Sequence, residues 1–210
     1  MPSSLTAAGL ATAVAELTAR DPDLAAIVGR YGPPPLWDRE PGFPTLLHII
    51  LEQQVSLASA QAAFDRLRVV ADPLTPSRFL ELSDAHLLSL GFSRQKARYG
   101  RALAAAIGSG ELDLKGLVDL DDEGVHAALQ AVPGIGPWSS TIYLLMVLGR
   151  PDVWPVGDIA LAESVGAVKG LGHRPGAAEM VELGDAWRPW RSVAARLLWH
   201  DYLARRGRSG

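Results

Sequence analysis

The stretch that decides the fold is Val132-Pro133-Gly134-Ile135-Gly136-Pro137-Trp138-Ser139-Ser140. Two glycines separated by one apolar residue allow a tight turn that a side chain would obstruct. Apolar residues recur at helical spacing from Val125 to Val132, and the run from Ile142 to Leu148 is almost entirely apolar. Pro137 suits the first turn of a helix, because the amide proton it lacks would have no partner there. The pattern therefore predicts a helix, a short glycine hairpin and a second, buried helix.

The hairpin itself is a candidate site for an anion. The amides around Gly134, Ile135 and Gly136 are expected to face solvent at a helix N-terminus, where negative charge is stabilised. Such a hairpin can hold a nucleic-acid phosphate without reading the base sequence. The alternative is a plain helix–helix turn without a ligand, which an isolated G-x-G also fits.

The segment resembles the helix-hairpin-helix of base-excision DNA glycosylases, in which a loop after the hairpin carries a catalytic aspartate. About twenty residues after the hairpin, Trp154-Pro155-Val156-Gly157-Asp158-Ile159-Ala160-Leu161 matches that loop and places the aspartate at Asp158. The similarity is greatest to the 3-methyladenine DNA glycosylase II branch and extends from Phe43 onward. It implies an all-α, two-lobed fold with the active-site cleft between the lobes.

The order of predicted elements agrees with an all-α chain, since no alternating strand pattern, repeat or low-complexity tract is present. The proline-rich connector from Pro33 to Pro44 is the best candidate for a lobe boundary. We expect residues 1–41 and 151–210 to form one helical lobe and residues 42–150 the other, with the helix-hairpin-helix near 124–147. Capping and stop residues predict two N-terminal helices, Leu5–Ala19 and Asp21–Tyr31. A buried helix is expected from Thr45 to about Gln53, and a separate helix follows it to about Arg68. Further helices are expected over Ser83–Gly91, Ser93–Ile107, from Asp121 into the hairpin, over Asp158–Gly166, and from Pro189 to about Arg206.

Composition bounds the class of protein. With 210 residues and 48% hydrophobic content, the chain can bury a proper core. No apolar run approaches ~20 residues and no signal peptide opens the chain, so we expect an intracellular, cytoplasmic protein without a membrane partner. The absence of cysteine excludes disulfides and the cysteine-ligated iron–sulfur cluster that some relatives carry. A net charge of −3 gives no global attraction to DNA, so binding has to come from local patches.

Asp158 is the first candidate for chemistry. Cleavage of a glycosidic bond at deoxyribose passes through an oxocarbenium-like state, which a nearby carboxylate stabilises. The same carboxylate can orient or deprotonate the attacking water. The helix start that is predicted after Gly157 would favour its ionised form through the helix dipole. The alternative is an ordinary helix N-cap.

Trp138 indicates which kind of glycosylase the chain resembles. Glycosylases that also cut the strand generally have a lysine here, whose amine forms a Schiff base with the sugar. A tryptophan implies a monofunctional enzyme that uses water as its nucleophile. By resemblance, Trp138 and Trp199 line a pocket for an alkylated, cationic purine, which suits the electron-rich indole face. The alternative is that the tryptophans belong to the core, which is favoured for Trp187 and Trp190.

The pocket departs from the family's pattern at one position. Relatives often have a tyrosine four residues after the hairpin tryptophan, whereas this chain has Ile142 there and Tyr143 next. Ile159 follows the aspartate where some relatives have tyrosine. We expect Ile142 and Tyr143 to line the pocket and to affect the range of lesions.

The resemblance also places a base-replacing loop at Gln53, Gln54 and Ser56. A wedge has to replace the stacking and hydrogen bonds lost when a nucleotide is flipped, at a cost of a few kcal/mol. An amide can bond the orphaned partner base, which favours Gln54 as the wedge with Gln53 nearby. A solvated helix terminus is the alternative.

The remaining candidates are basic. Arg94, Arg98 and Arg101 share a helical face with Lys96 beside it, so they could follow the phosphate backbone, although a solvated face is the ordinary role of such a run. The five histidines have no metal-ligand pattern, so we expect no cofactor and no metal held by side chains. By resemblance, backbone carbonyls of the hairpin can hold a structural monovalent cation.

Together these features predict a monomeric, monofunctional DNA glycosylase that removes alkylated purines, 3-methyladenine foremost, from double-stranded DNA. One alternative is a glycosylase of the same fold acting on deaminated or cyclic-adduct bases. Another is a non-catalytic helix-hairpin-helix module that only binds DNA, which would require neither Asp158 nor a base pocket.

Overall fold

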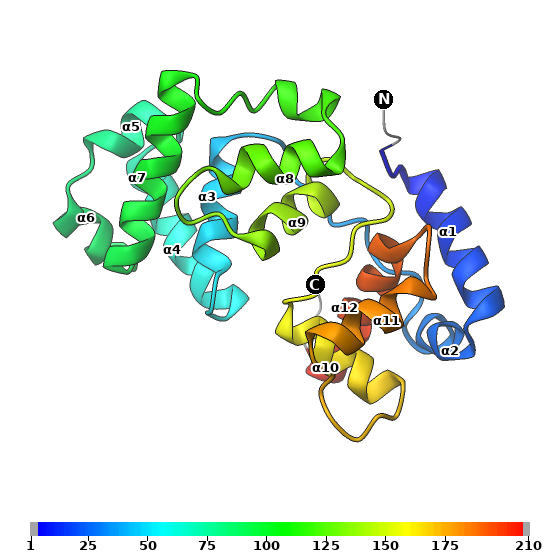
Figure 1. The fold of residues 1–210 in the computed structure, drawn as a ribbon. Coiled ribbons are helices and arrows are strands. Elements are labelled where there is room, and N and C mark those ends of the chain that lie inside the picture. Colours follow the sequence, from blue (N-terminus) through cyan, green and yellow to red (C-terminus); the bar gives the residue numbers. More distant parts are fainter. Residues whose placement is uncertain (1–3, 208–210) are drawn as a thin grey trace. The chain divides into compact units, whose positions relative to one another are not determined.

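A computed structural model describes residues 4–207, and all of its regular secondary structure is helical (Figure 1). The prediction of an all-α fold is therefore confirmed. Over this range the α-helices are α1 (Ala7–Arg20), α2 (Pro22–Tyr31), α3 (Phe43–Glu52), α4 (Leu57–Val70), α5 (Pro76–Glu81), α6 (Asp84–Ser89), α7 (Arg94–Ser109), α8 (Asp122–Gln130), α9 (Pro137–Met146), α10 (Ile159–Val168), α11 (Ala177–Asp185) and α12 (Arg191–Arg205), with a 3-10 turn at Gly116–Asp119.

Side-chain caps fix where many of these helices begin. Ser93 accepts a hydrogen bond from the Lys96 amide at the start of α7, and Asp121 accepts one from the Gly124 amide at the start of α8. Asp21 caps α2 in the same way, with Pro22 following as the first helical residue. Each cap satisfies an amide that has no partner inside the helix. These local signals explain why most predicted helices are present.

The helix predictions were wrong or incomplete in several places, among them the following. The first helix begins at Ala7, because Thr6 caps it and the Leu5 amide bonds to the Gly149 carbonyl. The last begins at Arg191, because the Trp190 amide closes a turn onto the Trp187 carbonyl. Neither α5 nor α11 was predicted. For α5 the signal was present in its Thr75 cap and Pro76, whereas α11 has no side-chain cap hydrogen bond.

The helices form two compact units, and the first comprises Arg39–Tyr143. In it α3 packs against α4 and α7, while α5 and α6 pack against α7 (Figure 1). Seven of the ten residues of α3 are buried, among them Leu46, Leu47 and Ile50. Burial on this scale makes α3 the central helix of the unit. The burial extends to its C-terminal end, where Leu51 and Glu52 are buried.

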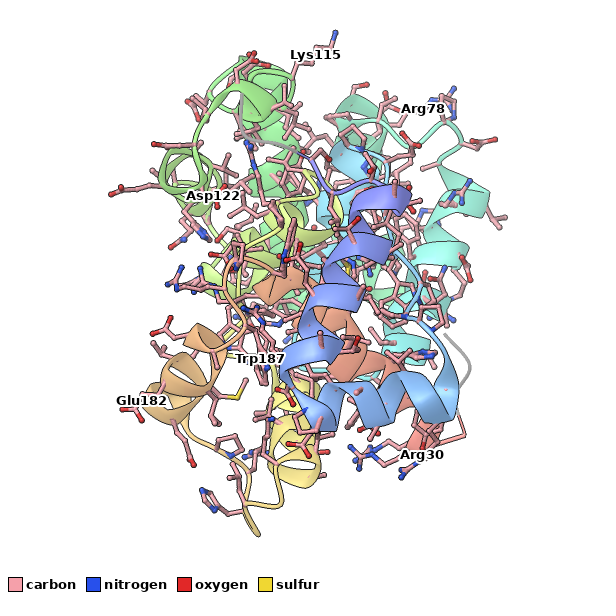
Figure 2. The ribbon with its side chains drawn as sticks, turned by 90° about the vertical axis from the view of Figure 1, so that its right-hand side faces the viewer. Arg30, Arg78, Lys115, Asp122, Glu182 and Trp187 are labelled. Atoms are coloured by element: carbon pink, nitrogen blue, oxygen red, sulfur yellow. The ribbon has the colours of Figure 1, made fainter. Side chains whose placement is uncertain are left out.

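Of the described residues, the second unit contains 4–38 and 144–207. Its central helix is α12, which packs against α1, α2 and α10. The Arg196 side chain is buried within it and donates hydrogen bonds to the carbonyls of Leu36, Ser192 and Leu145. Trp187 lies inside this unit with 1% exposure, as predicted for a core residue, whereas Glu182 projects from its surface (Figure 2). Among the described residues, no helix has the length and apolar character that crossing a membrane requires.

Candidate active site and DNA-binding elements

The glycine hairpin joins α8 to α9, and its two glycines have different environments. Gly134 has φ +97°, and a Cβ there would overlap the ring of Tyr99. Gly136 has an ordinary φ, and a Cβ there would meet nothing within 4 Å. Ile135 between them is 4% exposed and anchors the turn in the core. The fold therefore requires glycine at 134, whereas Gly136 leaves open space at the start of α9.

A polar network supports the hairpin from α8. The Ser140 Oγ lies 2.7 Å from His126 Nδ1 and 3.2 Å from the Gly136 carbonyl oxygen, and it accepts a hydrogen bond from Gln130 Nε2 at 3.0 Å. Ser140 is fully buried. Sequence reasoning assigned no role to His126 or Gln130. Their spacing of four residues on one helical face was the signal for a shared contact.

The proposed wedge loop connects α3 to α4. Gln54 is exposed and has φ +57°, a left-handed conformation that is uncommon for a residue other than glycine. Gln53 is half-buried, and its Nε2 donates to the Gly134 carbonyl and to Ser139 Oγ, both at 2.8 Å. Ser56 is exposed and caps α4 by accepting a hydrogen bond from the Ser59 amide. The two glutamines therefore face different surroundings.

The basic residues of α7 also separate into two groups. Arg94 and Arg98 are exposed. The Lys96 ammonium donates to the Leu51 carbonyl at the end of α3, at 2.6 Å, and burial lowers the pKa of Lys96 below its usual 10.5. Arg101, which shares the face of Arg94 and Arg98, bonds to the Asp84 carboxylate and the Leu82 carbonyl. Lys96 and Arg101 thus hold neighbouring elements of their own unit.

Asp158 lies at the N-terminus of α10 in the second unit. Its Oδ1 accepts hydrogen bonds from the Leu161 amide at 2.8 Å and from Trp199 Nε1 at 3.1 Å. Trp199 comes from α12 and is 8% exposed. The two hydrogen bonds fix the direction of Oδ1. Because Asp158 is only half-buried, it also retains contact with solvent. Trp199, expected to line the base pocket, therefore also contacts the candidate catalytic group.

The other expected pocket residues belong to α9. Trp138 is half-buried in its first turn. Ile142 is 2% exposed and Tyr143 is fully buried, so both contribute to the core. Burial raises the pKa of Tyr143 to about 12, and its hydroxyl has no hydrogen-bond partner among the described residues. Within the same residues, no group of three or more metal-ligating side chains is present.

Comparison with known proteins gives the same family that the hairpin indicated. Residues 47–189 match the HhH-GPD superfamily base excision DNA repair protein family. The crystal structure of a DNA-3-methyladenine glycosidase from Bacillus halodurans is 30% identical, with a TM-score of 0.73 over 90% of this chain and 88% of that one. The fold is also that of Schizosaccharomyces pombe 3-methyladenine DNA glycosylase in complex with abasic DNA, with a TM-score of 0.82 at 24% identity over 90% and 95% of the two chains.

The length of the match varies among curated relatives. The chain spans 65% of a Bacillus subtilis protein to which it is 29% identical, and 40% of another from that bacterium, named DNA-3-methyladenine glycosylase. It spans 79% of DNA-3-methyladenine glycosylase 1 of Schizosaccharomyces pombe, at 25% identity.

Proposed function

Because the chain belongs to the HhH-GPD superfamily of base excision DNA repair proteins, we propose that it is a monofunctional DNA glycosylase releasing alkylated purines, 3-methyladenine foremost. Its proposed partner is intracellular double-stranded DNA with a damaged base, bound by one copy of the chain. The observation that carries the proposal is Asp158, a half-buried carboxylate at a helix start, oriented by the Leu161 amide and Trp199.

Asp158 is proposed to act on both the sugar and the water. As the bond between the anomeric carbon and the purine nitrogen breaks, its electron pair leaves with the base, and positive charge develops on the sugar. The carboxylate stabilises this charge at short range. It then accepts a proton from the water whose oxygen bonds to the anomeric carbon. A single carboxylate is sufficient because an alkylated purine is already cationic and leaves as a neutral base.

Trp138 is proposed to contact the flipped base and to exclude lyase chemistry. An indole has no amine that could form a Schiff base with the sugar, so the product is an intact strand with an abasic site. A cation over an indole face gains about 0.5–2 kcal/mol, which favours a cationic base over a neutral one. Gln54, exposed at the loop after α3, is the proposed wedge, with Arg94 and Arg98 near the phosphate backbone.

The hairpin is proposed to hold one phosphate. Gly136 immediately precedes α9, and the space where its Cβ would lie is open, so a DNA backbone can approach the peptide closely. The N-terminus of α9 favours an anion at the same place. This grip does not depend on base sequence, which suits an enzyme that has to search undamaged DNA.

The test is release of free bases from methylated duplex DNA, with each base identified by mass. We expect 3-methyladenine to be the main product, an abasic strand that remains uncut until alkali is added, and no covalent complex after borohydride treatment. Binding without base release would favour a DNA-binding module instead. A borohydride-trapped adduct would contradict the water-dependent mechanism.

A further inference from the structure

Gln53 connects two elements that the proposed function uses separately, the hairpin and the wedge loop. Its Nε2 donates to the Gly134 carbonyl and to Ser139 Oγ, which lie 81 and 86 positions away along the chain. A carbonyl oxygen can only accept, so the amide nitrogen has to face it, and the two contacts use both of its hydrogens. Gln53 therefore has no amide donor left for a DNA base.

The neighbouring residue is presented in the opposite way. Gln54 is exposed, and its backbone is left-handed with φ +57°. A residue other than glycine holds this conformation only where its surroundings impose it. Contacts on both sides of Gln54 hold this conformation. Before it, Lys96 donates a hydrogen bond to the Leu51 carbonyl, and after it, Ser56 caps α4. Gln53 completes this support by fixing the turn to the hairpin.

From these contacts, and resting on the proposed function, we propose that Gln53 is a positioning residue. It fixes the wedge Gln54 relative to the phosphate-binding hairpin. The hairpin that binds the DNA backbone and the loop that probes the base stack therefore move as one rigid body. The first contact of the hairpin with a phosphate then sets the place at which Gln54 enters the duplex. A loop that moved independently would have to be ordered again at each position along the DNA.

The glutamine side chain is suited to this task in a way that close substitutes are not. Methionine has a similar length but no donor, so Gln53→Met leaves the Gly134 carbonyl and Ser139 without this partner. Glutamate would place a charged oxygen against the Gly134 carbonyl. Ser139→Ala removes one of the two acceptors while Gln53 remains. Gln61→Met, at an exposed position of α4, is the matched control for the change in chemistry.

The experiment measures binding of each variant to a duplex with a tetrahydrofuran abasic-site analogue and to the same duplex undamaged. A 2-aminopurine opposite the analogue reports wedge insertion by its fluorescence. We expect Gln53→Met to lower the preference for the damaged duplex about tenfold and to reduce the fluorescence change, with a smaller loss for Ser139→Ala. Gln61→Met should match the wild type.

A double-mutant cycle decides whether Gln53 acts through Gln54. In a Gln54→Ala background, where no wedge remains, Gln53→Met should change the preference less than twofold. An equal tenfold loss in that background, or equal losses on damaged and undamaged duplexes, would show that Gln53 only supports the hairpin. If Gln53→Met does not fold, the same cycle with Ser139→Ala gives the answer. Failure of the proposed function is distinct, since the wild type itself would then release no base.

Discussion

Asp158 caps α10 and is also the proposed charged group and base of the reaction, and asparagine can perform only the capping role. Asparagine caps helices about as well as aspartate and can accept from the Leu161 amide and Trp199, but it carries no charge and cannot take a proton. We expect Asp158→Asn to bind damaged DNA normally while base release falls by about 10²–10⁴-fold, the usual share of a general base. Single-turnover release from methylated DNA measures this.

The matched control is Asp121→Asn, since Asp121 caps α8 through the same kind of contact and has no assigned role in the reaction. Both variants should unfold at the wild-type temperature. Turnover by Asp158→Asn at the wild-type rate would remove Asp158 from the mechanism.

Trp199 can act through its ring or through its N–H, and two substitutions separate these roles. Phenylalanine keeps an aromatic face but loses the donor to Asp158, whereas leucine loses both. We expect Trp199→Phe to lower kcat about tenfold, equivalent to ~1.4 kcal/mol. The loss should lie in kcat rather than in KM, because the missing N–H bond orients the carboxylate and not the bound base. A normal kcat in Trp199→Phe, with loss only in Trp199→Leu, would assign the residue to base stacking alone.

At the scale of elements, the hairpin predicts opposite outcomes for its two glycines. Gly134→Ala places a side chain at positive φ and against Tyr99, so it should lower stability by at least about 1 kcal/mol. A Cβ at Gly136 would meet no atom within 4 Å, so we expect Gly136→Val to leave the folded state intact. It should nevertheless weaken binding to damaged and undamaged duplexes alike, by about tenfold or more, because the side chain fills the space where the phosphate approaches.

Fluorescence anisotropy with both duplexes, beside thermal unfolding, measures this difference. Gly29→Val is the control, since Gly29 is exposed and, as at Gly136, an added Cβ would meet no atom within 4 Å. If Gly136→Val weakened only damaged-DNA binding, the hairpin would not be the general phosphate grip.

At the scale of the whole molecule, the second unit depends on contacts between the two ends of the chain. Asp21, at the start of α2, accepts hydrogen bonds from the Lys169 ammonium at 2.8 and 2.9 Å and from Trp187 Nε1 at 2.7 Å. Burial alone would raise the pKa of Asp21, but the bonds from Lys169, Trp187 and the Leu24 amide outweigh it and lower the pKa below 3.8. For Lys169, burial would lower the pKa, but bonds to Asp21 and Asp23 raise it above 10.5.

Lys169→Met should therefore destabilise the chain by about 1.5–3 kcal/mol at pH 7, the range for hydrogen bonds to a charged group. Because the Asp21 pKa is lower in the folded state, its contribution is present above pH ~3.8 and is lost as the pH falls through the folded value. The difference between wild type and variant should accordingly shrink in acid. Urea unfolding from pH 7 downward measures it, with the exposed Lys115→Met as control. A difference that stayed constant with pH would mean that packing, not the ion pair, is responsible.

The sequence by itself determined the elements whose signals are local. A cap and the amide it satisfies are three residues apart at Ser93, Asp121 and Asp158, and a glycine hairpin between apolar helical runs is contained in a short stretch. Because both partners of each such contact lie within one short stretch, the all-α structure and the helix-hairpin-helix were predictable from the sequence. The helix α11 was missed because its start lacks a side-chain cap hydrogen bond and its burial depends on distant partners, such as Trp154 against Gly184.

Only the tertiary structure decided which side chains share a contact over long separations. Gln53 meets the hairpin across 81 positions, Lys96 meets Leu51 across 45, and Trp199 meets Asp158 across 41. No periodicity encodes these distances, because they depend on how separate helices pack. The same packing assigned different roles to neighbours with identical side chains. Gln53 bonds to the hairpin, whereas Gln54 is exposed and has a left-handed backbone.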